Sequence, residues 1–274
     1  MTAVDVELSE PWASETEAAS APPKSPTRLS VADVLTLGNA VCGFASVYFT
    51  TTAVLIPHLS SGEGAGSVRQ GAAAAVMLVL LASLFDLCDG LVARRFRSSG
   101  MGAELDNLSD LISFGLSPAY FVVVWGIVSG FPLMPVAAAA VAILLAGLLR
   151  LARFSVTEMR DGMFQGMPIP FAALTVLSLS LLEPPFLLAI LGVLAVAWLM
   201  ISRIEYPKPS GRWAVLSVCW IMVNVGCLIS WAAGAPGAEG TMVIGCMLQV
   251  ALAALLPVVA LALHVSGRRT PSEA

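Results

Sequence analysis

Four aspartates in the first half of the chain have the types and spacing needed for metal-dependent chemistry. Asp86 and Asp89 are three residues apart, and Asp106 and Asp110 are four residues apart. On an α-helix, these spacings place the members of each pair on one face. Each pair adjoins an apolar run, so an antiparallel helical hairpin would bring all four carboxylates together. The pattern therefore predicts one acidic site.

Four carboxylates at the mouth of a membrane repel one another unless cations bind between them. Oxygen ligands without neighbouring His or Cys favour magnesium, manganese or calcium over zinc. A pair of divalent ions bridged by carboxylates is suited to binding a pyrophosphate and to stabilising charge during displacement at phosphorus. We expect two divalent ions, Mg²⁺ or Mn²⁺, held by Asp86, Asp89, Asp106 and Asp110.

Glycine and arginine residues flank the aspartates. Gly90 and Gly102 lack a side chain, so a bulky ligand could approach the backbone closely there. Arg94 has a fixed spacing from the aspartates and is a candidate phosphate contact. Arg95 and Arg97 are interpreted as positive charges that mark the cytoplasmic face of the membrane.

Two other interpretations of the acidic cluster compete with phosphoryl chemistry. The first is a turn at the membrane interface whose acids are simply solvated. The second is a cation transporter or proton-coupled carrier, because carboxylates inside a membrane also line ion pathways. The acids are concentrated at one predicted membrane mouth, with none inside the later apolar segments to continue a path. This placement favours an enzyme.

The composition is that of a polytopic membrane protein. Hydrophobic residues make up 58% of the 274 residues and charged residues 12%, whereas soluble domains carry about 25% charged residues. Residues 1–30 lack a basic segment followed by an apolar one, so they are predicted to be a disordered cytosolic tail and not a signal peptide. We expect one transmembrane domain over residues 31–267 and a cytosolic tail over residues 268–274. The five cysteines show no CxxC spacing and are expected to be buried thiols.

The elements that must position the aspartates are apolar helices. A helix needs about 20 apolar residues to cross the hydrocarbon core, which predicts an all-α bundle of about eight transmembrane helices. The expected spans are residues 33–56, 71–92, 105–129, 134–154, 168–182, 185–204, 213–233 and 241–264. Of the 14 Lys and Arg residues, only Arg69 falls on one side of this arrangement. The asymmetry places both termini and the aspartates on the cytoplasmic side.

The whole stretch from Asp86 to Asp110 follows the pattern DxxDGxxAR, then seven residues, then GxxxDxxxD. The filled positions are Asp86, Asp89, Gly90, Ala93, Arg94, Gly102, Asp106 and Asp110. This resembles the signature of the CDP-alcohol phosphatidyltransferase family. The resemblance implies the helical membrane fold of this family. It also implies that these residues bind the diphosphate of a CDP-linked lipid through two metal ions. It further implies that Asp110 is the general base for the acceptor hydroxyl, that Gly90 and Gly102 lie against the cytidine, and that CMP leaves.

Three further stretches, residues 35–49, 150–174 and 199–208, resemble the phosphatidylserine synthase branch. That resemblance implies CDP-diacylglycerol and L-serine as substrates, with glycerol phosphate, inositol phosphate and choline as alternative acceptors. Arg150 and Arg153 could bind the serine carboxylate through a bidentate fork, or simply extend to the interface. Gln165 is a further candidate serine contact. We also expect a cell-membrane location, contact with membrane lipids, a homodimer from the resemblance alone, and no nucleic-acid partner.

Overall fold

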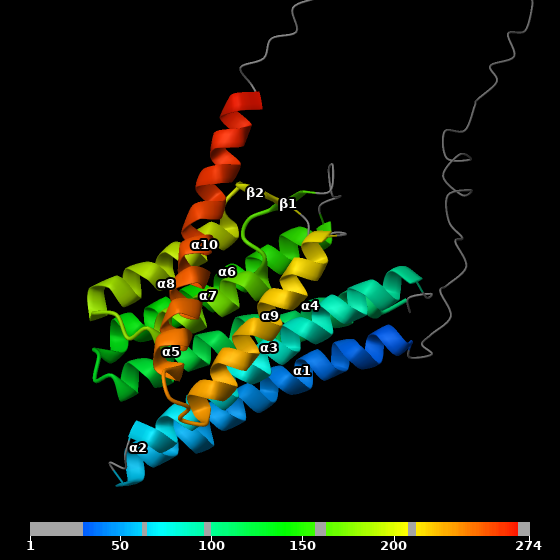
Figure 1. Cartoon of the computed structure of the whole chain (residues 1–274). Helices are drawn as coiled ribbons and strands as arrows, with labels where there is room; N and C mark the ends of the chain where they lie inside the picture. The colour runs from blue at the N-terminus through cyan, green and yellow to red at the C-terminus, as the bar shows by residue number, and fades with distance from the viewer. Residues whose placement is uncertain (1–29, 62–64, 96–99, 157–162, 208–211, 268–274) are drawn as a thin grey trace, which may run out of the picture.

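A computed structural model describes residues 30–61, 65–95, 100–156, 163–207 and 212–267 of the chain (Figure 1). The predicted tails, residues 1–30 and 268–274, lie outside this part of the chain except for Ser30. The helices are α1 (Val31–Phe49), α2 (Ile56–Ser61), α3 (Ala65–Arg95), α4 (Gly102–Asp110), α5 (Ser117–Val128), α6 (Leu133–Val156), α7 (Ile169–Leu181), α8 (Phe186–Ile201), α9 (Arg212–Ala232) and α10 (Ala238–Gly267). Two π-helical turns, η1 (Thr50–Leu55) and η2 (Leu111–Leu116), join α1 to α2 and α4 to α5.

The predicted all-α membrane bundle is confirmed. Five continuous helical stretches of the described chain have the length and apolar composition to cross a membrane: Val31–Ser60, Gln70–Val92, Gly102–Val128, Leu133–Ser155 and Ala238–Val258. Three shorter apolar helices, Ile169–Leu181, Phe186–Ile201 and Val218–Ala232, bring the total to the eight predicted segments. The chain is therefore a multi-pass membrane protein.

The first helix begins at a capping box and turns its polar side inward. The Ser30 side chain accepts a hydrogen bond from the Asp33 backbone, and an Asp33 carboxylate oxygen accepts one from the Ser30 backbone at 2.7 Å. This reciprocal cap starts the helix at Val31, two residues before the predicted span. Val34 and Phe44 are exposed on the outside of α1. The buried polar residues on its inward face are Asp33, Thr36, Asn39 and Ser46, and Thr50 of η1 continues this face.

Helix α7 is short because prolines bound it, and it lies in the interior of the bundle. Pro168 caps its start, Pro170 stands in its first turn, and Pro184 and Pro185 follow its end. Its 13 residues extend about 20 Å at 1.5 Å per residue, less than the thickness of a bilayer core. It packs against α3, α5, α8 and α10, and most of its side chains are buried. The fifth predicted segment is thus a core helix.

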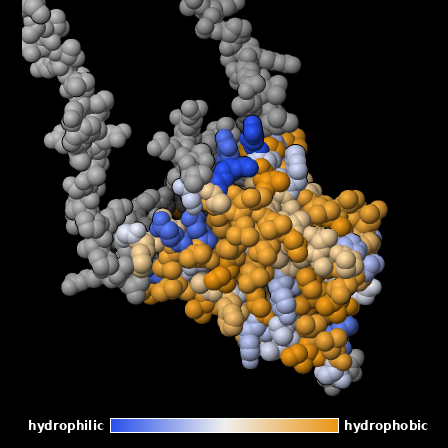
Figure 2. All heavy atoms as spheres, turned by 180° about the vertical axis from the view of Figure 1, so that it is seen from behind, coloured by the Kyte–Doolittle hydropathy of each residue, from blue (hydrophilic) through white to orange (hydrophobic). Residues whose placement is uncertain are grey.

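The outer surface of the bundle suits a lipid environment. Figure 2 shows a face dominated by hydrophobic residues, with most of the strongly hydrophilic residues of this view in its upper part. Large apolar side chains are exposed on several helices, including Leu149, Trp198 and Met247. In water such a surface would aggregate, whereas in a bilayer it contacts lipid.

A short antiparallel sheet, which the sequence did not predict, joins two segments at one end of the bundle. Strand β1 (Met163–Gln165) pairs with β2 (Glu205–Pro207), with Phe164 opposite Tyr206. Gly166 follows β1 with φ of +80°, a left-handed conformation that favours glycine. A Cβ atom at this residue would collide with the Met200 carbonyl oxygen. The sheet therefore fixes the segment between α6 and α7 against the end of α8.

Candidate active site

The predicted acidic site is present, and three of the four aspartates form its centre. Asp86 lies on α3, and Asp106 and Asp110 lie on α4. One carboxylate oxygen from each of these three residues lies within 4.8 Å of the other two. Both helices pack along α1, whereas α3 and α4 make few direct backbone contacts with each other. The two pairs meet as the hairpin prediction required, and α1 is the common support.

The fourth aspartate lies outside this group of three and accepts a hydrogen bond from a threonine. Asp89 is buried on α3, and its Oδ2 atom lies 2.8 Å from the Thr36 hydroxyl oxygen. The same hydroxyl lies 3.0 Å from the Ala32 carbonyl oxygen, so its single hydrogen is shared between two acceptors. Asp89 still interacts electrostatically with Asp106. Thr36 thus fixes the orientation of a carboxylate at the edge of the cluster.

Asp110 is oriented by an asparagine from the same face of α1. The Asn39 Nδ2 atom donates a hydrogen bond to Asp110 Oδ1 at 3.0 Å, and both side chains are buried. The backbone carbonyl of Asn39 in turn accepts a hydrogen bond from the Ser113 hydroxyl at 2.8 Å. Asp110 is the last residue of α4, where the π-helical turn η2 begins. Such turns often occur at functional sites.

A glycine on α1 makes this arrangement possible. A Cβ atom added to Gly43 would lie 2.6 Å from the Ser113 Cα atom. The two backbones therefore approach each other more closely than any residue with a side chain would allow. This close approach holds Asn39 and Ser113 at hydrogen-bonding distance.

The donor set suits hard divalent cations. Asp86, Asp106 and Asp110 all offer carboxylate oxygens. Within the described residues, no other group of three or more His, Cys, Asp or Glu side chains lies close enough together to hold a metal ion. Asp106 Oδ1 is buried without a hydrogen-bond partner in the same part of the chain. Adjacent unneutralised carboxylates in a membrane are unfavourable, so a cation between them would stabilise the site. The residues therefore fit the expected magnesium or manganese ions.

The glycine positions of the motif lie beside the aspartates. Gly90 follows Asp89 on α3, and apart from its own turn of the helix no atom of the described residues lies within 4 Å of the position that its Cβ would take. This open space agrees with the expected approach of a bulky ligand. Gly102 is the first residue of α4. The backbones of Ala93 and Arg94 belong to α3, whereas their side chains lie outside the described part of the chain.

The three candidate serine contacts occupy different environments. Arg150, near the end of α6, is half-buried and interacts electrostatically with Asp110 and Asp86. Its Nε atom is buried without a hydrogen-bond partner among the described residues. Arg153 instead donates from Nη1 to the Ile201 carbonyl oxygen at 3.1 Å. Gln165 is exposed on β1.

Sequence reasoning left two of the supporting residues without a role. Thr36 and Asn39 are not among the site residues that the sequence predicts. The detectable signal is the inward-facing polar series of α1, which recurs at helical spacing in an apolar helix. A polar group inside a membrane is unfavourable unless it has a partner. The series therefore indicated that α1 packs against polar groups, although it could not name them.

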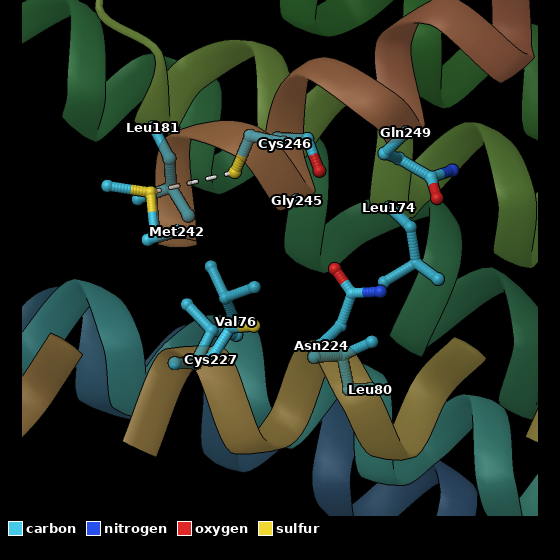
Figure 3. Close-up of a pocket in the computed structure, with 12 residues that line it drawn as sticks. Val76, Leu80, Leu174, Leu181, Asn224, Cys227, Met242, Gly245, Cys246 and Gln249 are labelled. Carbon is cyan, nitrogen blue, oxygen red and sulfur yellow. Dashed lines mark hydrogen bonds between the residues drawn. The ribbon is translucent and has the colours of Figure 1, made fainter. Parts of the chain in front are cut away.

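A separate pocket lies between α3, α7, α9 and α10 (Figure 3). It contains none of the aspartates, and its wall includes the thiol groups of Cys227 and Cys246. Its buried Gln249 side chain accepts a hydrogen bond from Trp220 at 2.8 Å and lies 3.2 Å from the Thr175 hydroxyl. All five cysteines are free thiols; Cys42 and Cys246 are buried as expected, whereas Cys88 and Cys227 are half-buried and Cys219 is exposed.

Comparisons with known proteins extend over most of the chain. Residues 29–265 match the family model described as CDP-alcohol phosphatidyltransferase. CDP-diacylglycerol–serine O-phosphatidyltransferase of Bacillus subtilis is 31% identical, over 66% of this chain and 96% of the relative. Archaetidylserine synthase of Methanothermobacter thermautotrophicus is 35% identical, over 68% of this chain and 73% of the relative. CDP-diacylglycerol–serine O-phosphatidyltransferase of Saccharomyces cerevisiae is 36% identical, over 56% of this chain and 54% of the relative.

Proposed function

The chain belongs to the CDP-alcohol phosphatidyltransferase family, and from this premise we propose that it is a phosphatidylserine synthase. It would transfer the phosphatidyl group of CDP-diacylglycerol to the hydroxyl of L-serine and release CMP. Family membership confirms the resemblance that the motif from Asp86 to Asp110 indicated. The choice of serine is supported by the names of the relatives, which agree on serine and differ in the lipid.

The observation that carries the proposal is the arrangement around Asp110. Its Oδ1 atom accepts a hydrogen bond from Asn39 Nδ2. Asp86 and Asp106 contribute oxygens within 4.8 Å of its carboxylate. The positive charge of Arg150 also acts on this carboxylate. A candidate base, an acidic cluster that fits divalent ions and a cation therefore lie close together. A hydroxyl group and a diphosphate could meet there.

The acceptor hydroxyl would be activated by Asp110. A carboxylate oxygen takes the proton of the serine hydroxyl while the hydroxyl oxygen attacks the phosphorus on the lipid side of the diphosphate. The bond between this phosphorus and the bridging oxygen breaks, and CMP leaves with the bridging oxygen. When bound by Asp86, Asp89, Asp106 and Asp110, two divalent ions supply charge neutralisation for the diphosphate.

The remaining residues of the site would bind the two substrates. Arg150 is suited to the serine carboxylate, because its guanidinium group is positively charged and carries an unpaired buried Nε donor. The open space beside Gly90 is suited to the cytidine, with Gly102, Ala93 and Arg94 as further contacts of the CDP-lipid. Arg153 is better interpreted as a structural residue, since it already donates to the Ile201 backbone. We retain Gln165 as a candidate serine contact from the sequence.

We further propose that the protein lies in the cell membrane with the active site and both termini on the cytoplasmic side. The bias of Lys and Arg along the sequence supports this orientation. We also propose one transmembrane domain over residues 31–267 with a cytosolic tail at each end. The proposed homodimer rests on the family resemblance alone.

CMP release tests the proposed reaction. Purified protein in detergent is given CDP-diacylglycerol and Mg²⁺ or Mn²⁺ with L-serine, glycerol 3-phosphate, inositol phosphate, choline or no acceptor. Release with L-serine alone is the expected result. Release with a different alcohol would keep the family and reject serine. Metal-dependent cation flux in sealed vesicles, without CMP release under any condition, would instead favour a transporter.

A further inference from the structure

Asn39 has a free hydrogen-bonding atom in the interior of the site. Its side chain is fully buried, and its Nδ2 atom donates a hydrogen bond to Asp110. Its Oδ1 atom has no hydrogen-bond partner among the described residues. Since Oδ1 and Nδ2 belong to one planar amide, the free oxygen necessarily lies beside the Asp110 carboxylate. A buried acceptor of this kind is costly unless a donor binds to it.

The unpaired polar atoms of the structure point to the same place. Within the described residues, four buried side-chain atoms lack a partner, and three of them belong to Asn39, Asp106 and Arg150. The fourth, on Trp125, lies on α5 outside the acidic cluster. Two of the three site atoms accept hydrogen bonds and the third donates one. Together they match a ligand that carries both donors and an acceptor.

We propose that Asn39 has two roles: it positions Asp110, and its Oδ1 atom accepts a hydrogen bond from the ammonium group of the acceptor substrate. This inference rests on the proposed function, in which the acceptor is L-serine. Serine has three polar groups on a short carbon frame. Asp110 takes the hydroxyl proton and Arg150 binds the carboxylate, which leaves the ammonium group for a neutral acceptor.

The chemistry of the amide suits an ammonium group better than a second carboxylate would. The aspartates are expected to be shared with the metal ions, and Oδ1 of Asn39 is an acceptor that carries no charge to be neutralised. The donor side of the same amide prevents Asp110 from turning, because Asp110 Oδ1 is fixed at 3.0 Å from Nδ2. The other Asp110 oxygen is therefore left for the reacting hydroxyl and the expected metal ions. A single side chain would couple recognition of the amine to orientation of the base.

The test compares two inhibitors that lack the hydroxyl and so cannot be phosphatidylated. L-Alanine keeps the ammonium and carboxylate groups of serine, and propionate keeps the carboxylate alone. Their inhibition constants against L-serine are measured for the wild type, Asn39→Leu and Asn39→Asp. We expect the wild type to bind L-alanine about tenfold or more tighter than propionate, because a hydrogen bond to a charged group contributes about this much to affinity.

The two variants separate the two roles. Asn39→Leu removes both functions, so the preference for L-alanine should fall to within about threefold and kcat should fall as well. Asn39→Asp keeps an acceptor but loses the donor to Asp110, so it should retain the preference while kcat falls by about tenfold or more. A control on the same helix is Ser46→Ala, which loses hydrogen bonds to Ala75 and Ser117. It should keep the wild-type preference.

The outcomes distinguish this inference from the proposed function. If the wild type releases no CMP with L-serine, the proposed function itself fails. If serine is a substrate but the wild type binds L-alanine and propionate equally, the inference on the ammonium group is wrong. An unchanged preference in Asn39→Leu would refute it too. If that variant does not fold, loss of the preference in the isosteric Asn39→Asp has the same meaning, and an unchanged kcat in Asn39→Asp would refute the positioning role.

Discussion

Replacing Gly43 with alanine should separate α1 from η2 and misalign the catalytic base. The new Cβ atom would lie 2.6 Å from the Ser113 Cα atom, whereas carbon atoms in contact are about 3.5 to 4.0 Å apart. The two backbones must therefore separate by about 1 Å. The Asn39 to Asp110 hydrogen bond is 3.0 Å long, and an added ångström would break it.

Both stability and turnover should fall as a result. Overpacking of this kind costs about 1 to 3 kcal/mol, and a misplacement of about 1 Å at a reacting group can reduce turnover about a hundredfold. The assay is CMP release with L-serine, with the thermal unfolding midpoint measured on the same preparation. We expect kcat to fall more steeply than the affinity for the CDP-lipid, because the displaced contact belongs to Asp110 and not to the nucleotide.

The matched control is Gly38→Ala on the same helix. A Cβ atom at Gly38 would lie 3.5 Å from the Phe85 ring, which is an ordinary contact. This variant should keep the wild-type turnover and unfold at or above the wild-type midpoint, because alanine favours the helix more than glycine does. The reasoning would be refuted if Gly43→Ala were as active and stable as Gly38→Ala, because the close approach of α1 to η2 would then have no energetic weight.

Three further predictions concern individual side chains. Asp110→Asn should leave CDP-lipid binding largely intact while turnover falls by about a hundredfold or more, the usual weight of a general base; normal turnover would exclude Asp110 as the base. Asp89→Asn should raise the Mg²⁺ or Mn²⁺ concentration needed for half-maximal activity, and an unchanged metal titration would count against a shared acidic site. Arg150→Ala should raise KM for serine more than KM for the lipid, whereas Arg153→Ala should mainly lower the unfolding midpoint by removing the hydrogen bond to Ile201; equal effects on both substrates in Arg150→Ala would indicate a structural role.

The same helix, α1, supports both the metal-binding part and the acceptor-binding part of the proposed site. Thr36 contacts Asp89, and Asn39, one turn later, contacts Asp110. If Asp89 serves the metal ions and Asp110 serves the acceptor, α1 fixes the distance between the two halves of the reaction. The exposed apolar side of α1 faces away from the bundle, where lipid would lie. A helix that is polar inward and apolar outward is the arrangement that a membrane environment requires.

The class of the fold and the chemical centre of the site follow from local properties of the chain. Apolar segments of sufficient length are a local property of the chain, so the eight helical segments could be predicted with errors of a few residues at their ends. The spacing within each aspartate pair is also local, because the turn of the helix alone places Asp86 with Asp89 and Asp106 with Asp110. The motif could therefore predict both the acidic site and the family.

The groups that support the aspartates, and the arginine that faces them, depend on how the helices pack. Arg150 and Arg153 are three residues apart on one helix, yet one acts on the acidic cluster and the other binds the end of α8. The pairing of β1 with β2 and the burial of α7 likewise depend on segments distant in sequence. Helical periodicity specifies the face on which a side chain lies, but its partner depends on how the helices pack. For this reason the contact of Asn39 with Asp110, across 71 residues, could be seen only in the folded chain.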